Sequence, residues 1–71
     1  MLKANVEAFK KLMQDKKFNT SSFARYLELS RSTIWRVLQN GDSPGEEFIA
    51  KFKNKFPKLK FEDYFFTNNV A

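Results

Sequence analysis

The sequence predicts an all-α fold, a single domain of five helices with no β-strand. Apolar residues recur at intervals of three and four, which is the spacing of an amphipathic helix. Residues that cap helices stand ahead of the apolar stripes at Asn19, Ser30 and Ser43. Because 71 residues are close to the lower limit for a core without staples, we expect one domain spanning residues 1–71.

The first helix is expected to end near Lys16. Its inward stripe consists of Leu2, Val6, Phe9 and Leu12 or Met13. Asn5 can cap this helix, but Leu2 extends the stripe further towards the N-terminus, so the first helical residue stays open. Phe18 is expected to close the first helix onto the second.

Between Asn19 and Gly41, two short helical patterns follow each other with a connection that leaves room only for a tight turn. The first pattern opens at Asn19, whose side chain can accept hydrogen bonds from free backbone N–H groups. Its apolar face consists of Phe23, Ala24 and Leu27. This stretch therefore predicts a helix-turn-helix over residues 19–41.

The second pattern opens at Ser30, and Leu29 can cover its start as a hydrophobic staple. Its buried stripe consists of Ile34, Val37 and Leu38. The positions that point away from this stripe are Arg31, Ser32, Trp35, Arg36 and Gln39. No expected core contact uses these side chains, so they are available to bind something else.

A fourth helix is expected from Pro44 to about Lys55, and Pro57 stops it. Ser43 and Glu46 have the spacing of a capping box, and Pro44 would occupy the first helical position. The inward stripe consists of Phe48, Ile49, Phe52 and Phe56. Between these positions stand Lys51, Lys53 and Lys55, which are most simply a solvent-exposed face.

The composition argues against catalysis and against a metal site. The chain has neither cysteine nor histidine and only two glycines, so the commonest metal ligands, the commonest general base and a glycine-rich phosphate loop are all missing. We therefore expect no enzyme, no metal and no cofactor. The formal net charge of +5 favours nucleic acid as a partner, although many small domains carry such a charge only for solubility.

No run of residues is long and apolar enough for a membrane span, and the N-terminus lacks the apolar core of a signal peptide. The absence of cysteine is compatible with a reducing compartment. We therefore expect a soluble cytoplasmic protein without a membrane partner.

The run F-A-x-x-L-x-L-S-x-S-T-I-x-x-V-L-x-N-G, residues 23–41, resembles the helix-turn-helix of the Cro/CI/XRE family of phage and bacterial regulators. Ala24 matches the small residue where the two helices cross, and Ile34 and Val37 match core positions of the recognition helix. The resemblance extends from about Val6 to Phe66. It departs from the family at Glu28, which stands where the turn usually has glycine.

The resemblance implies a compact five-helix, lambda-repressor-like DNA-binding domain. It implies that residues 59–66 form a short fifth helix, and residues 67–71 are expected to form a frayed tail. The implied function is a sequence-specific transcriptional regulator or repressor that places residues 30–39 in the major groove of double-stranded DNA.

The expected base contacts are Arg31, Ser32, Trp35 and Arg36. The expected phosphate contacts are Thr20, Asn40 and Ser43. A plainer interpretation stays open for each group: the arginines can simply be solvent-exposed, and Thr20 and Ser43 can act only as helix caps. Capping and phosphate binding do not exclude each other.

A second function is a protein-interaction module, such as a phage antirepressor or modulator that binds a partner repressor. Large exposed aromatic residues are common at the centres of protein interfaces. The expected protein interface comprises Trp35, Arg36, Tyr64, Phe65 and Phe66. Adjacent residues of a helix point about 100° apart, so at least one of the last three is expected to be exposed or buried in a partner. The same three residues are the candidate surface for a homodimer.

Overall fold

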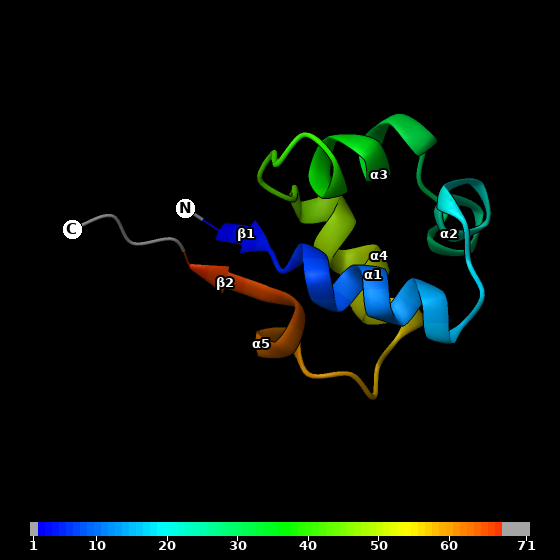
Figure 1. Cartoon of the computed structure of the whole chain (residues 1–71). Coiled ribbons are helices and arrows are strands. Elements are labelled where there is room, and N and C mark those ends of the chain that lie inside the picture. The colour runs from blue at the N-terminus through cyan, green and yellow to red at the C-terminus, as the bar shows by residue number, and fades with distance from the viewer. Residues whose placement is uncertain (1, 68–71) are drawn as a thin grey trace.

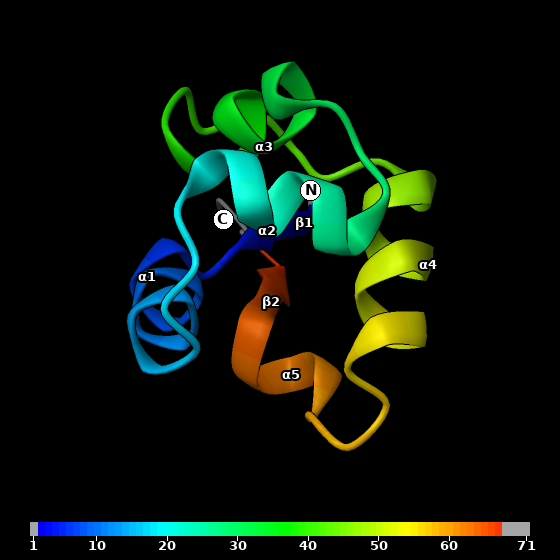
Figure 2. The ribbon, with the colours of Figure 1, turned by 90° about the vertical axis from the view of Figure 1, so that its right-hand side faces the viewer.

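The computed structural model describes residues 2–67 and contains, within that range, five α-helices and two short β-strands (Figure 1). In chain order the elements are β1 (Leu2–Ala4), α1 (Val6–Asp15), α2 (Thr20–Leu27), α3 (Arg31–Leu38), α4 (Glu46–Lys55), α5 (Phe61–Tyr64) and β2 (Phe65–Thr67). In Figure 2, α1 and α4 lie on opposite sides, while α3 and α5 lie at opposite ends. Within the same range, no helix combines the length and apolarity that crossing a membrane requires.

The all-α prediction is wrong, because β1 and β2 form an antiparallel two-stranded sheet. Its register pairs Leu2 with Thr67, Lys3 with Phe66 and Ala4 with Phe65. The sequence did not predict this sheet for three reasons. Strands of three residues are too short to show an alternating pattern, and Leu2 also fits the helical stripe of the next segment. Pairing also depends on residues from opposite ends of the chain.

The structure settles where α1 begins and shortens the expected last helix. The Asn5 side chain accepts a hydrogen bond from the Ala8 backbone N–H at 3.3 Å, so α1 starts directly after Asn5 and excludes Leu2. The Asn5 N–H donates to the Tyr64 carbonyl at 2.8 Å, which extends the pairing of the two ends. Helix α5 ends at Tyr64, and Thr67, expected in a frayed tail, lies in β2. The rest of that expected tail, residues 68–71, lies outside the described residues.

Two of the three predicted caps are confirmed. The Asn19 side chain accepts from the Ser22 N–H at 2.8 Å, and the Ser22 hydroxyl accepts from the Asn19 N–H at 2.9 Å, which completes a capping box. The Ser30 hydroxyl accepts from the Thr33 N–H at 3.1 Å. Helices α2 and α3 therefore start where the sequence predicted.

The third predicted cap is wrong. Helix α4 begins at Glu46, its N-cap is Gly45, and no side chain caps it. Glu46 is therefore the first helical residue, whereas a capping box needs it at the third position. Pro44 is buried ahead of the helix and does not occupy its first turn. Helix α4 therefore begins after a buried proline and a glycine N-cap, without the hydrogen bonds of the predicted capping box.

The turn between α2 and α3 depends on Glu28, which is left-handed with φ 60° and ψ 41°. A non-glycine residue in this region costs on the order of 1–2 kcal/mol. The Glu28 carboxylate compensates in part, because it lies 3.1 Å from the Lys55 ammonium at the end of α4. Lys55 is therefore more than a solvent-exposed residue, since it links the turn to another helix.

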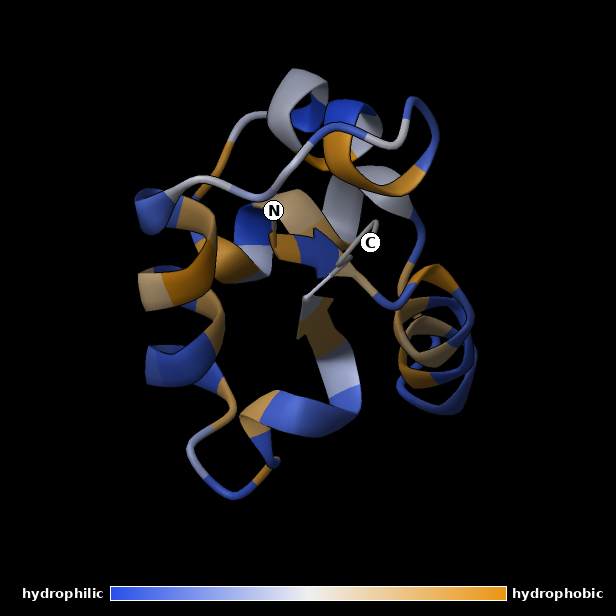
Figure 3. Ribbon diagram, turned by 90° about the vertical axis from the view of Figure 1, so that its left-hand side faces the viewer, coloured by the Kyte–Doolittle hydropathy of each residue, from blue (hydrophilic) through white to orange (hydrophobic). Residues whose placement is uncertain are grey.

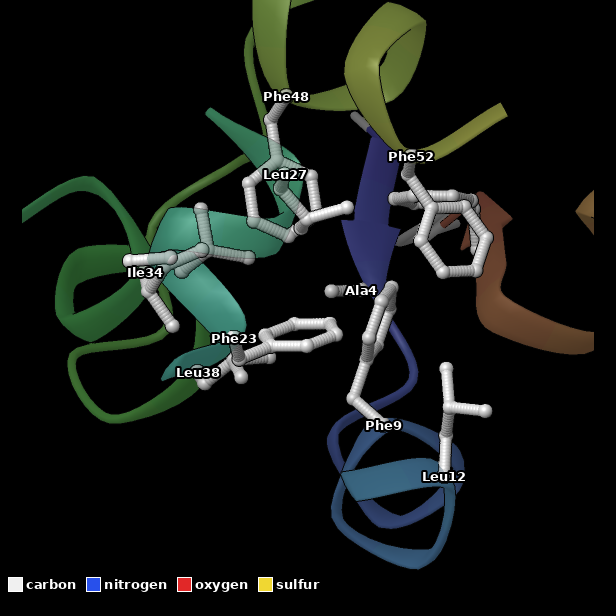
Figure 4. Packing of buried hydrophobic residues seen from close by; sticks show 12 residues of the cluster. Ala4, Phe9, Leu12, Phe23, Leu27, Ile34, Leu38, Phe48 and Phe52 are labelled. Carbon is white, nitrogen blue, oxygen red and sulfur yellow. The ribbon is translucent and has the colours of Figure 1, made fainter. Parts of the chain in front are cut away.

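The core is built around aromatic side chains. Its buried hydrophobic members are Ala4, Phe9, Leu12, Phe23, Ala24, Leu27, Ile34, Val37, Leu38, Phe48, Phe52 and Phe65. Figure 3 shows hydrophobic and hydrophilic segments alternating along the helices, as amphipathic helices require. In Figure 4, Phe9 from α1, Phe23 from α2 and Phe52 from α4 point towards the same space. Phe65 is fully enclosed, Tyr64 is half-buried and Phe66 is exposed, so the three do not share one environment.

Replacing Ala24 by leucine should destabilise the protein by about 1–3 kcal/mol, because extra methylenes in a filled core force strain. Ala24 is 2% exposed on α2, which packs against α3. Chemical denaturation of both proteins measures the difference. An unchanged free energy of unfolding would mean that α2 has room for a larger residue on its buried face.

The Glu28 pKa offers a second test. The Lys55 ammonium holds the pKa of Glu28 below its ordinary value of 4.5, first through the hydrogen bond and then through its charge, with a smaller effect from Lys51. The ion pair therefore stabilises the fold above about pH 4.5, and this contribution is lost as the pH falls through the lower pKa of the folded state.

In the variant Lys55→Met, the Glu28 pKa should rise towards its ordinary value. A pH titration of the side-chain carboxyl by NMR measures it. Lys53→Met is the control, because it removes an exposed lysine from the same helix that does not contact Glu28. An identical Glu28 titration in the two variants would contradict the ion pair.

Candidate nucleic-acid interface

Helix α3 presents a polar and aromatic face to solvent. Ile34, Val37 and Leu38 are buried, so the remaining side of the helix points outwards, at the edge of the molecule in Figure 1. The exposed positions include all four predicted base contacts, Arg31, Ser32, Trp35 and Arg36. Trp35 is 53% exposed, which is unusual for the largest apolar side chain in the chain.

These four residues line one shallow groove between the start of α2 and α3. The groove encloses about 570 Å³, and its lining residues are Thr20, Ser21, Arg31, Ser32, Trp35 and Arg36. We call it the α2–α3 groove. It brings together the four predicted base contacts and one predicted phosphate contact, Thr20. It also contains Ser21, which sequence reasoning did not select and whose only signal was its position beside Thr20.

Arg31 connects the two walls of the α2–α3 groove. Its guanidinium donates a hydrogen bond to the Ser21 hydroxyl at 3.4 Å. A long arginine side chain loses conformational freedom when it binds a ligand, and a contact already made in the free protein reduces that cost. Arg31 is thus partly positioned along the groove.

The α2–α3 groove carries positive charge only. Its two charged side chains are Arg31 and Arg36, and no carboxylate lines it. Guanidinium groups donate several hydrogen bonds in a planar fork, which suits phosphate oxygens and the acceptor edge of guanine. The groove can therefore bind an anionic partner that offers flat or apolar groups to Trp35.

No family model matches this chain, and no curated protein or solved structure matches it either.

Ser43 lies in a second hollow on the other side of Arg36, which lines both. This hollow encloses about 300 Å³, and its lining residues are Thr33, Arg36, Val37, Asp42, Ser43, Gly45, Glu47 and Phe48. The carboxylates of Asp42 and Glu47 give it charge of both signs. A phosphate near Ser43 would therefore meet repulsion as well as attraction.

The capping interpretation of Thr20 and Ser43 does not hold. Asn19 caps α2, so Thr20 is the first helical residue, and Gly45 is the N-cap of α4. In the part of the chain that the structure describes, neither hydroxyl makes a hydrogen bond. Both are exposed and free to bind a ligand.

Asn40 lines neither of the two hollows. Its side-chain amide donates to the Asp42 carboxylate at 3.0 Å, so a phosphate would have to compete for it. The following residue, Gly41, has φ 76°, and its carbonyl accepts from the Lys3 ammonium at 2.9 Å. The segment after α3 is therefore held to β1, near the N-terminus.

The predicted protein interface is not one surface. Phe65 is 2% exposed, because β2 places its side chain opposite Ala4 in the core. Phe66, the next residue of β2, pairs with Lys3 and is 49% exposed. Trp35 and Arg36 lie on a different element, α3. Of the C-terminal aromatic residues, only Phe66 remains as an exposed contact.

Within residues 2–67, no group of three or more acidic side chains converges on a point that could hold a metal ion. The chemistry that the α2–α3 groove offers is hydrogen bonding, charge and stacking.

Proposed function

We propose that this protein is a sequence-specific DNA-binding transcriptional regulator of the Cro/CI type, and that α3 enters the major groove of double-stranded DNA. The observation that carries the proposal is the α2–α3 groove, in which two arginines, a serine and a tryptophan stand together with no carboxylate among them. The helix is short and lies at the edge of the domain, which suits entry into a groove about 12 Å wide.

Arg31 and Arg36 are the proposed readers of guanine. Each guanidinium can donate two hydrogen bonds to O6 and N7 of guanine, and a good pair of this kind contributes about 1–3 kcal/mol of discrimination between bases. Ser32 can bind either a donor or an acceptor on a base edge. Trp35 can cover a thymine methyl group with its apolar ring.

The hydroxyls of Thr20 and Ser21 at the start of α2 are the proposed phosphate contacts on one side of α3. Both residues line the α2–α3 groove with Arg31, which donates a hydrogen bond to the Ser21 hydroxyl. Such contacts fix the position of the helix on the duplex and carry no sequence information themselves. Ser43 is the corresponding contact on the other side, where Arg36 offsets the neighbouring carboxylates.

A second candidate function is a module that binds another regulator through the same groove. Trp35 favours it, because an indole exposed to 53% is a typical anchor at the centre of a protein interface. The partner in that case offers a pocket for the indole and carboxylates for Arg31 and Arg36. A cationic groove that has hydroxyl side chains and no carboxylate fits DNA better, because phosphates line both sides of the DNA major groove.

The first test is to replace Arg31 and Arg36 by alanine, one at a time. Each change should weaken binding to the preferred duplex by about 1–3 kcal/mol and relax the preference at one base pair. Selection from a random duplex library gives the preferred sequence, and fluorescence anisotropy gives the affinities.

Arg25→Ala is the matched control. Arg25 is exposed on α2 and lines neither hollow beside α3. Its removal should lower affinity for all sequences alike, through the loss of one positive charge. The proposal fails if the library selection at low salt returns no preferred sequence, or if the three variants behave alike.

The second test uses Asp42→Asn, which keeps the shape of the side chain and removes its charge. Asp42 lines the hollow that holds Ser43 and Arg36, where it repels an approaching phosphate. The variant should bind the preferred duplex more tightly by about 0.2–1 kcal/mol. Glu62→Gln is the control with the same change of net charge, because Glu62 is exposed on α5, at the opposite end from α3. Equal gains in both variants would show that no phosphate lies near Ser43.

A further inference from the structure

A third groove lies away from α3, where the end of α2 meets the segments that follow α1 and α4. It encloses about 420 Å³, and its lining residues are Lys16, Phe18, Tyr26, Lys55, Phe56, Pro57, Lys58 and Leu59. It shares no lining residue with either hollow beside α3. We call it the Tyr26 groove, and its chemistry can be considered separately from that of α3.

The floor of the Tyr26 groove is a concave set of aromatic rings. The Tyr26 ring centroid lies 5.3 Å from that of Phe18 and 5.4 Å from that of Phe56. The ring planes are inclined by 41° and 50°, and because all three residues line a hollow, the rings form a cup and not a flat platform. Tyr26 remains 44% exposed. A cup of this kind can accept one branched or aromatic side chain.

The charged side chains that line the Tyr26 groove are all positive. Lys16, Lys55 and Lys58 line the groove, and no carboxylate does. Lys55 is engaged, since its ammonium lies 3.1 Å from the Glu28 carboxylate and 5.7 Å from the Tyr26 ring centroid. Lys16 and Lys58 are exposed and form no ion pair with any residue in the range 2–67. They leave two ammonium groups unneutralised beside an apolar surface.

We propose that the Tyr26 groove binds an acidic peptide segment of a partner protein. A leucine or aromatic side chain of the peptide sits on Phe18, Tyr26 and Phe56, and its carboxylates face Lys16 and Lys58. The complementary charge speeds association and orients the peptide, while the apolar contact supplies most of the affinity. This interaction does not depend on DNA binding.

Single-stranded nucleic acid also combines lysines with aromatic rings, but it stacks its bases on open, flat ring faces. Here the rings are tilted against one another, and the Lys55 ammonium lies over Tyr26. The geometry therefore favours a side chain that enters a cup over a base that stacks on a platform.

The probe is a fluorescently labelled heptapeptide with leucine at its centre and aspartate or glutamate elsewhere, titrated with the full chain by anisotropy. Binding should be saturable, and it should weaken at least tenfold when the central leucine is replaced by alanine. The double variant Lys16→Glu, Lys58→Glu should weaken it at least fivefold. The control Lys10→Glu, Lys11→Glu has the same net charge, changes two exposed lysines of α1 outside the groove, and should change affinity less than twofold.

Tyr26→Ser tests the apolar floor and should weaken binding at least fivefold. If that variant does not fold, the Tyr26 backbone amide resonance of the unchanged protein should shift on addition of the peptide. Absence of binding, equal losses in the two lysine double variants, or no effect at Tyr26 would overturn the proposal. Tighter binding of a single-stranded oligothymidine that depends on the same lysines would overturn it as well.

Discussion

The packing of other rings around Phe9 is the contact on which the rest of the domain depends. Phe9 is fully buried on α1, with ring centroids at 5.0–6.4 Å in edge-to-face contact with Phe23, Phe48, Phe52, Tyr64 and Phe65. These partners come from α2, α4, α5 and β2, so one side chain joins both ends of the chain to the middle helices. Edge-to-face pairs contribute about 0.5–1.5 kcal/mol each beyond area burial. With α1, α2 and α4 fixed around this ring, α2 provides the surface on which α3 packs with its polar face outwards.

Local chemistry made most helices predictable, and long-range pairing made the sheet unpredictable. Asn19 and Ser30 cap α2 and α3 where the sequence placed them, because a cap depends only on residues one turn away. The start of α4 was misplaced because burial of Pro44 and a glycine cap outweigh a capping box that the sequence also permits. The sheet of β1 and β2 was missed because it joins Ala4 to Phe65, a pairing with no local pattern.

Helical periodicity predicted which residues of the candidate site are exposed on α3. Spacing alone placed Arg31, Ser32, Trp35 and Arg36 on the exposed side of α3, and the fold gathers them in one groove with Thr20. Periodicity does not show which hydrogen bonds a side chain makes or which charges lie near it. The loop after α3 brings Asn40 into a hydrogen bond with Asp42 and places carboxylates beside Ser43. Helical spacing does not predict either contact. The Tyr26 groove was missed because its members come from three separated segments.

If the exposed face of α3 reads DNA sequence, as we propose, the single tryptophan of the chain can report the binding. Trp35 lies in the α2–α3 groove, so its fluorescence should change when a ligand enters. The decisive measurement is the Trp35 emission at about 0.15 M salt during titration with the library-selected duplex and with a duplex of the same bases in scrambled order. We expect a saturable change with the selected duplex at concentrations that leave the emission unchanged with the scrambled one. The same response to both duplexes, or no response to either, would contradict it.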